Sequence, residues 1–385
     1  MGLHVASVRL RRAVLGHRRY PGDAEAILRA GLEDCWSGEY LTASPGHYRQ
    51  FWMRDTGFAA GSLVRLGDPW PARLLSSLAW AMDVWRARRS HVTTTINPVL
   101  RWPADVFDYG VDSLPLLLAS LQALVRSADG PTAAGAAALV REHERWIEAE
   151  IRYFVDRVVD PATGLVRSDR HFSAHRDTFR NGSTAYANTM VAILARTVVE
   201  TGWCPDLLSR HFEGSDGSRS RAWGSLLRRH FWTGDRFRDR LGTEETSGEA
   251  NVLPFWPGTV EDPAMLTTAL ETLRLEGYTS PYPLRFTAGH SAEGLLPAYR
   301  IWSADYQTTT SWTSLGSMYL ALLHRADPAL AAIELDRMRG LIEWHGTFWE
   351  VLDGEGRPWR SSSRLSVSDV SMLWGAILLE TLQTA

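Results

Sequence analysis

The chain has 385 residues, a formal net charge of −3 and 45% hydrophobic residues, enough for a large core and without the strongly basic balance of a nucleic-acid-binding protein. All 41 basic residues are arginine, which excludes Schiff-base chemistry and a Walker-type phosphate loop, because both require lysine. Only Cys35 and Cys204 occur, which argues against a disulfide framework and a cysteine-rich zinc site.

The N-terminal segment from Met1 to Tyr20 is rich in arginine and has no sustained apolar run, so we expect no signal peptide. No apolar run approaches the roughly 20 residues that span a bilayer. His171 and His175 form a His-x-x-x-His pair, but their arginine-rich surroundings are typical of a loop rather than of a metal-binding helix. We therefore expect a soluble cytoplasmic protein without metal, cofactor, membrane or nucleic-acid partner.

Twelve segments show the apolar periodicity of helices. In chain order they are Ala24–Cys35, Asp55–Leu66, Pro71–Arg86, Asp112–Ser127, Pro131–Val159, Ser183–Gly202, Ser218–Phe231, Asn251–Val260, Pro263–Glu276, Thr310–Ala326, Pro328–Trp344 and Ser368–Leu382. Four prolines suit the first turn of their helices: Pro71, Pro131, Pro263 and Pro328. Ser183 and Ser368 are expected N-caps.

Twelve helices without a strand layer allow a closed ring of six hairpins or an open solenoid. A solenoid should repeat at a fixed period, and the chain shows no aligned repeat. Longer connections occur at 87–111, 160–182 and 277–309, and long structured loops in a compact domain usually carry function. We predict an all-α fold, an (α/α)6 barrel in which residues 1–385 form one catalytic domain.

Six segments rich in polar and aromatic residues precede or begin a predicted helix. Candidate functional residues therefore gather in every second connection between helices. They are 51–55, 106–112, 175–183, 247–251, 305–312 and 348–350. This alternation predicts one pocket at one end of the barrel. Glycoside hydrolysis needs two carboxyl groups and aromatic faces against which a sugar ring can lie, and the chain has carboxylates in these segments and 17 Trp.

The motif Trp52-Met53-Arg54-Asp55 resembles the Trp-x-Arg-Asp signature of glucoamylases and related glycosidases with an (α/α)6 barrel. In that family the Arg-Asp pair grips the sugar at the non-reducing end, so the resemblance implies an exo-acting enzyme. An arginine fork can bind neighbouring hydroxyls or a carboxylate bidentately. An ordinary ion pair at a helix start would use the same residues.

The run from Arg176 to Ser183 resembles the segment of debranching, trehalase-like and mannosylglycerate-hydrolase-like members that carries the general acid on an Asp. Glucoamylases proper use Glu there. The resemblance implies that Asp177 is the acid, and a partly apolar setting would keep it protonated. A solvated loop aspartate paired with an arginine is the alternative, and other candidates for the role are Asp108, Asp112 and Asp169.

The stretch that begins Trp349-Glu350 and continues through Asp353-Gly354 resembles the family segment that supplies the catalytic base before the last helix. The resemblance implies that Glu350 is the base. A glutamate before a turn is also a common structural feature. Glu249 is the rival, although an acid in the first turn of a helix is favoured by the helix dipole alone.

The remaining polar and aromatic residues of these segments are expected to bind substrate. Together with the motif residues, this set is Trp52, Arg54, Asp55, Asp108, Tyr109, Asp112, Arg180, Asn181, Glu249, Asn251, Gln307, Trp312 and Trp349. Tryptophans serve protein cores as well as sugars.

The resemblance implies an inverting, exo-acting glycoside hydrolase that cleaves an α-linked glucoside or related hexoside, with Asp177 as acid and Glu350 as base. No β-sandwich domain is recognised before the barrel, which suggests a small soluble glycoside or oligosaccharide as substrate. Two alternatives stay open: a sugar epimerase or lyase on the same barrel, and a sugar-binding barrel without catalysis. Sequence does not fix the sugar or the oligomeric state.

Overall fold

The computed structural model describes residues 16–106, 108–179, 182–203, 221–256, 258–289, 295–297, 299, 305–361 and 366–385. Two residues expected to bind substrate, Arg180 and Asn181, lie outside the described residues.

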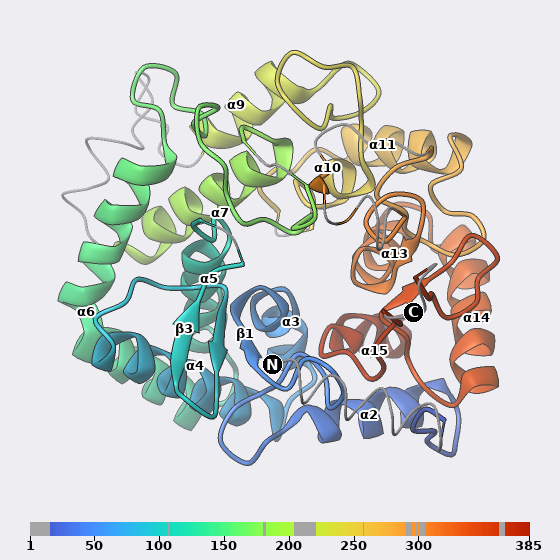
Figure 1. Cartoon of the computed structure of the whole chain (residues 1–385), viewed down its shortest axis with the longest axis horizontal. Helices are drawn as coiled ribbons and strands as arrows, with labels where there is room; N and C mark the ends of the chain where they lie inside the picture. The colour runs from blue at the N-terminus through green and yellow to red at the C-terminus, as the bar shows by residue number, and fades with distance from the viewer. Residues whose placement is uncertain are drawn as a thin grey trace.

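The described helices form two concentric layers (Figure 1). The inner helices are α3 (Met53–Arg65), α5 (Ser113–Val125), α7 (Ala185–Thr201), α10 (Gly248–Val252), α13 (Thr313–Ala326) and α15 (Gly375–Thr384). The outer helices are α2 (Ala24–Cys35), α4 (Trp70–Ala87), α6 (Gly130–Val158), α9 (Arg221–Phe231), α11 (Pro263–Leu275) and α14 (Pro328–His345).

The inner layer closes on itself, because each inner helix contacts the next and α15 packs against α3. The outer helices contact the inner ring, α2 against α15 and α14 against α13, for example. The structure is therefore the closed ring of hairpins and not the open solenoid. The predicted all-α (α/α)6 barrel is confirmed.

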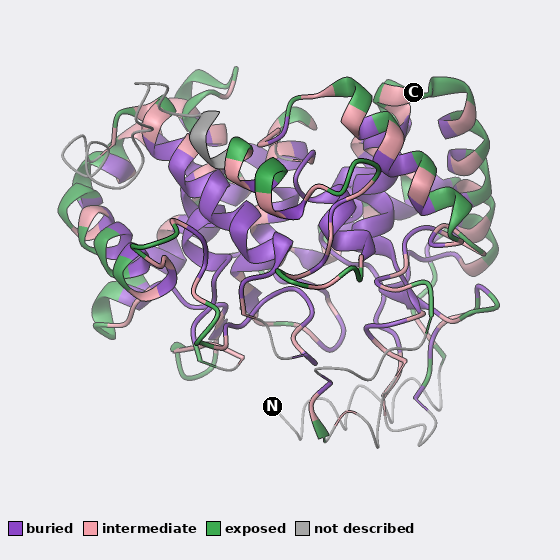
Figure 2. Ribbon diagram, turned by 90° about the horizontal axis from the view of Figure 1, so that it is seen from above, coloured by how far each residue is buried: buried purple, intermediate pink, exposed green. Residues whose placement is uncertain are grey.

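Buried residues concentrate in the inner helices, and exposed residues lie mainly on the outer helices (Figure 2). α5 is apolar nearly all round, as a helix enclosed on every side must be. α14 buries one stripe, which includes Leu335, Met338 and Ile342, and leaves its other face in water. The burial pattern of each helix thus decides the layer it occupies.

The helix starts follow local chemistry. Prolines occupy the first turn of α4, α6, α11 and α14, as expected. The two serine N-cap predictions were wrong. The cap of α7 is Thr184, whose hydroxyl accepts a hydrogen bond from the Ala187 amide. Ser368 lies in the loop before α15, where its hydroxyl accepts from the Val351 amide.

Two predicted helices differ in extent. α10 was expected over Asn251–Val260 but spans Gly248–Val252, because Pro254 lacks the N–H that a continuing helix would use. α15 was expected from Ser368 but begins at Gly375. The residues before Gly375 instead form loops that line the pocket described below.

The connections that enter the inner helices carry the short strands. β1 (Phe51–Trp52), β2 (Thr95–Asn97) and β3 (Trp102–Ala104) form one antiparallel sheet, and β4 (Ser311–Trp312) pairs with β5 (Val351–Leu352). The connections that leave the inner helices are shorter where the structure describes them fully: Asp327 alone joins α13 to α14. We call the end of the barrel that carries the entering connections the front.

In the described part of the chain, no helix is both long and apolar enough to cross a membrane.

Candidate active site

The front of the barrel holds a cavity of about 360 Å³. Its lining combines aromatic rings with charged and polar side chains, and all of them come from the connections before α3, α5, α7, α13 and α15 or from the N-terminal halves of α3 and α13. Seven of the residues predicted from sequence line it together: Trp52, Arg54, Asp55, Asp177, Gln307, Trp312 and Glu350. Five of the six segments rich in polar and aromatic residues therefore contribute to one pocket, and the segment 247–251 does not line it.

Arg54 and Asp55 lie in the first turn of α3. The Arg54 side chain is buried, and its Nε donates to Asp112 Oδ2 at 2.5 Å while its Nη1 lies 3.9 Å from Asp177 Oδ2. Tyr186 donates to the same Asp112 oxygen at 2.5 Å. Asp112 thus holds the Arg54 guanidinium in place by a buried hydrogen bond. The neighbouring carboxyl of Asp55 is also buried, which raises its pKa to about 7.

Asp177 lies in the loop before α7 with a quarter of its side chain exposed to the cavity side of the barrel. Gln307 donates a hydrogen bond to its carboxylate and is itself fixed, because its Oε1 accepts from the Thr178 amide at 2.9 Å. Burial raises the pKa of Asp177, and the charges of Arg54 and His175 and the Gln307 hydrogen bond oppose that rise.

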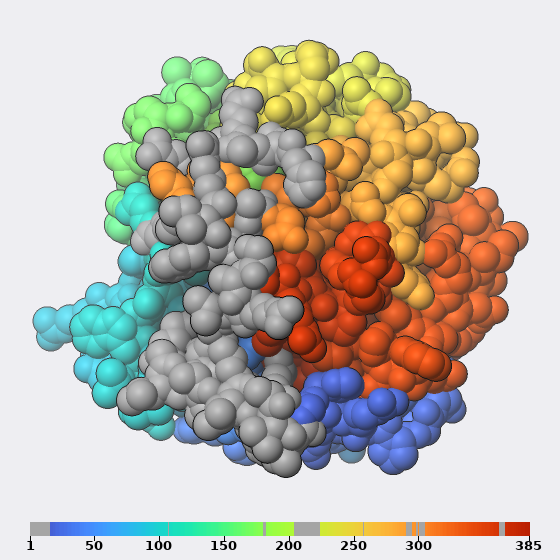
Figure 3. Space-filling model, turned by 45° about the vertical axis from the view of Figure 1, so that its right-hand side comes forward, coloured from blue at the N-terminus to red at the C-terminus, as the bar shows by residue number. Residues whose placement is uncertain are grey.

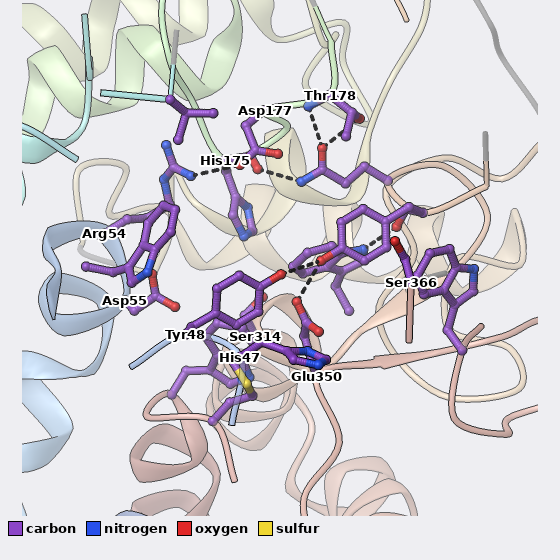
Figure 4. Close-up of a pocket in the computed structure, with 18 of the residues that line it drawn as sticks. His47, Tyr48, Arg54, Asp55, His175, Asp177, Thr178, Ser314, Glu350 and Ser366 are labelled. Atoms are coloured by element: carbon purple, nitrogen blue, oxygen red, sulfur yellow. Dashed lines mark hydrogen bonds and ion pairs between the residues drawn. The ribbon is translucent and has the colours of Figure 1, made fainter. Parts of the chain in front are cut away.

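Glu350 lies directly before β5 and is buried. Tyr306 Oη donates to its Oε1 at 2.7 Å, and the Asp369 amide donates to its Oε2 at 2.8 Å. Burial, followed by the nearby Asp369 charge, raises the pKa of Glu350 to about 7 although both hydrogen bonds favour the ionised form. Figure 4 shows Asp177 and Glu350 on opposite sides of the pocket.

Aromatic rings pack together on the side of the cavity that holds Glu350. The Tyr306 ring lies 4.9 Å from Trp312 and 4.7 Å from Trp359, so its hydroxyl has a fixed position at Glu350. Tyr48 Oη lies 3.3 Å from the Tyr306 hydroxyl and so extends this hydrogen-bonded group into the pocket.

No protein-family model matches the chain, and no curated protein matches it in sequence. Solved structures that resemble the chain include the following three. GH63 mannosylglycerate hydrolase from Thermus thermophilus, in complex with Tris and D-glycerate, has a TM-score of 0.62 at 14% identity over 94% of this chain and 100% of that chain. A rhamnosidase from Klebsiella oxytoca with rhamnose bound has a TM-score of 0.61 at 14% identity, over 95% of this chain and 66% of its own. A glycosidase variant in complex with glucose has a TM-score of 0.58 at 15% identity, over 94% and 96%.

The fold is that of the six-hairpin glycosidases. At these identities the likeness establishes the six-hairpin architecture, and the chemistry of the pocket must be argued from its own residues.

The other residues expected to bind sugar have different places in this six-hairpin barrel. Asp112 and Glu249 are buried behind the pocket, the first at Arg54 and the second 3.4 Å from His175 Nδ1. Asn251 is buried in α10, where its amide group pairs with the backbone of Phe237.

Three further candidates lie away from the cavity. Asp108 forms an ion pair with Arg157 at 2.6 Å and is half exposed. Tyr109 is fully buried in the core. Trp349 packs against the rings of His17 and His345. Its neighbour Glu350 lines the cavity instead.

Sequence reasoning missed several lining residues, chiefly Tyr48, His47, Trp359 and Trp374. Tyr48 precedes Trp52 by four positions, and an aromatic residue beside a charged motif was the available signal. Asp369 was also missed. Its carboxylate accepts from the His47 amide at 2.6 Å and from the Ser44 hydroxyl, so it ties the loop of Tyr48 to the backbone that holds Glu350.

Among the described residues, no group of three or more His, Cys, Asp or Glu side chains is arranged to hold a metal ion.

Proposed function

We propose that this protein is an exo-acting, inverting glycoside hydrolase, with Asp177 as general acid and Glu350 as general base. The observation that carries the proposal is the pair of carboxyl groups on opposite sides of one aromatic pocket (Figure 4). Inverting hydrolysis needs this arrangement, because one group protonates the leaving oxygen while the other activates a water on the far face of the sugar.

The electrostatics of the two groups support these roles. Burial raises the pKa of Asp177, which is the direction that favours a general acid. The pKa of Glu350 is raised to about 7 and so lies where a general base is effective near neutral pH. Tyr306 and the Asp369 amide orient both oxygens of Glu350, and Tyr48 lies where its hydroxyl can help to hold a water beside them.

The polar lining supports exo action on a small glycoside. Arg54 and Asp55 come from the first turn of α3, and Trp52 adjoins them, so charged groups and a ring face are available for a terminal sugar. The solved neighbours contain glucose, rhamnose or D-glycerate. We propose an α-linked glucoside or related hexoside with a small aglycone as the substrate class.

The test is hydrolysis of a panel of α-linked disaccharides and glucosyl- and mannosyl-glycerates, with the anomer of the released sugar followed by NMR. Asp177→Asn and Glu350→Gln should each lower the turnover by about 10²- to 10⁴-fold. The matched controls are Asp169→Asn and Glu355→Gln. Both replace carboxylates that are about two-thirds exposed and pair with nearby arginines, so both should retain activity.

Release of the β-anomer by the wild type and its loss in both variants would support the proposal. Release of the α-anomer would contradict inversion. Binding of a sugar without turnover would favour the non-catalytic barrel.

An epimerase is the second candidate, because His47 and His175 both line the pocket. Burial lowers the pKa of His175 to about 3, which makes it a weak base. An essential His175 together with a dispensable Glu350 would favour this reading.

A further inference from the structure

His175 is a pocket residue that the acid–base pair does not use. Its side chain is 6% exposed and points into the cavity from the loop before α7 (Figure 4). The rings of Phe58, Phe286 and Trp312 surround it at centroid distances of 5.7, 5.2 and 6.0 Å, and Tyr186 stacks on it at 6.1 Å. Because these rings hold the imidazole, its two nitrogens have fixed and different surroundings.

The rear nitrogen faces Glu249. Nδ1 of His175 lies 3.4 Å from Glu249 Oε2, and the Glu249 side chain is 3% exposed. Both atoms are buried, and within the described part of the chain neither has a hydrogen bond of good geometry. Buried polar atoms require partners, and across 3.4 Å a small rotation of either side chain brings these two into a hydrogen bond. Either the carboxylic acid donates to Nδ1, or Nδ1–H donates to a carboxylate.

The surroundings favour the first arrangement at neutral pH. Burial lowers the pKa of His175 to about 3; Arg54 and Arg176 act in the same direction, and the charges of Asp112 and Asp177 oppose them. Burial raises the pKa of Glu249 to about 8; Asp239 and Asp112 add to the rise, and Arg176 and Arg54 oppose it. The imidazole is therefore neutral while Glu249 holds a proton that it can donate to Nδ1. The ring proton is then on Nε2.

We propose that His175 is a specificity-determining hydrogen-bond donor, which directs Nε2–H at an oxygen of the bound sugar, and that Glu249 is the positioning residue that fixes this tautomer. The inference rests on the proposed glycosidase function. Asp55 and Glu350 are acceptors on the cavity lining when they are ionised, so a sugar hydroxyl that donates to one of these carboxylates still needs a donor for its own lone pairs. His175 supplies that donor beside Arg54.

The same geometry predicts a pH response. Ionised Glu249 must accept a hydrogen bond, so above about pH 8 the proton moves to Nδ1 and Nε2 becomes an acceptor. The donor to the sugar is then lost. Glu249→Gln cannot ionise, and its tautomer should not change with pH.

The first experiment is ¹⁵N NMR of histidine-labelled protein from pH 6 to 9.5, with His175 assigned from the spectrum of His175→Phe. We expect the Nε2–H tautomer at pH 6–7, a change toward Nδ1–H near pH 8, and no change in Glu249→Gln. An Nδ1–H tautomer or an imidazolium at pH 6–7 would overturn the proposal. This readout does not depend on any substrate.

The second experiment is calorimetric titration with D-glucose, D-mannose and their monodeoxy derivatives. His175→Phe should weaken binding of the parent sugar by about 5- to 30-fold, the worth of one hydrogen bond, and one deoxy sugar should bind wild type and variant equally. His143→Phe is the matched control, because His143 is also buried but lies on α6 and pairs with Arg86.

Equal affinities of wild type and His175→Phe for every sugar would overturn the donor role. Failure of the wild type to bind any of these sugars would instead count against the proposed function, and the NMR result alone would then decide the tautomer.

Discussion

Three carboxyl groups at the front of the barrel keep their protons to unusually high pH. Burial raises the pKa of Asp55 and Glu350 to about 7 and that of Glu249 to about 8. These groups come from three separate connections or first turns. A neutral carboxyl can donate a hydrogen bond, and a carboxyl that titrates near pH 7 can accept a proton. The front of the barrel therefore contains both kinds of group at the same pH.

The hydrogen bond from Tyr306 lowers the pKa of Glu350. Tyr306→Phe should therefore raise that pKa and move the acidic limb of the pH profile of kcat/KM toward higher pH, because the base must be ionised. The measurement is the pH profile on the best substrate of the panel. Tyr153→Phe, at a 41% exposed position, is the control and should leave the limb unchanged. A shift to lower pH would contradict the role of this bond.

The buried carboxyl of Glu350 lowers the stability of the folded protein when it is ionised. Between pH 4.5 and about 7 the unfolded Glu350 is ionised while the folded one keeps its proton, so stability falls as pH rises through this window. The full cost is about 3 kcal/mol above pH 7. Glu350→Gln should raise the Tm at pH 8 and leave it unchanged at pH 4. Calorimetry at both pH values is the test, and a lower Tm at pH 8 would show that the ionised form is not penalised.

At the scale of elements, apolar periodicity located the long described helices, because each buries one face or all of its surface against a neighbour. The short helix α10 was placed only in part, since its expected range overlaps it at Asn251 and Val252 alone. The helix ends were harder to predict. Ser368 has the chemistry of an N-cap but lies in a loop that lines the pocket, and only contacts with distant segments decide between the two. Tyr48 and Asp369 were missed for the same reason. Tyr48 meets Tyr306 from another connection, and Asp369 meets Glu350 from 19 residues further along the same connection.

The contact between α3 and α5 depends on a glycine. A Cβ on Gly57 would lie 2.4 Å from Leu116 Cβ, so Gly57→Ala should force the two inner helices apart and cost about 1–3 kcal/mol. Gly340 lies within α14 and has no neighbour within 4 Å of such a Cβ, so Gly340→Ala should add about 0.5–1 kcal/mol. Urea denaturation measures both, and equal effects at the two sites would contradict the packing argument.

At the scale of the molecule, the ring is closed by helices from the two ends of the sequence. α2 packs on α14 and α15, and Figure 3 shows the N-terminal segment in blue beside the last hairpins in orange and red. Tyr20 and Cys35 both contact Ser371 across this seam. Closure between distant segments couples the hairpins, so we expect them to unfold together.

Leu28 of α2 is 2% exposed and lies against the position of Gly375 in α15. Leu28→Ala should cost about 2–5 kcal/mol and shift the near-ultraviolet and far-ultraviolet circular dichroism transitions equally. Leu275→Ala, at a 70% exposed position, should change stability by less than about 0.5 kcal/mol. Separate transitions in Leu28→Ala would mean that the seam can open while the other hairpins stay folded.

The front connections carry every cavity-lining residue outside the N-terminal halves of α3 and α13, whereas the helices that pack into rings meet beneath them. Substitutions and insertions in a front loop can therefore alter which molecule is accepted while the ring contacts are preserved. Proteins that share this fold can therefore differ in almost every residue. The 14–15% identity to ligand-bound structures that superimpose over nearly the whole chain shows how little of the sequence the ring fold itself requires.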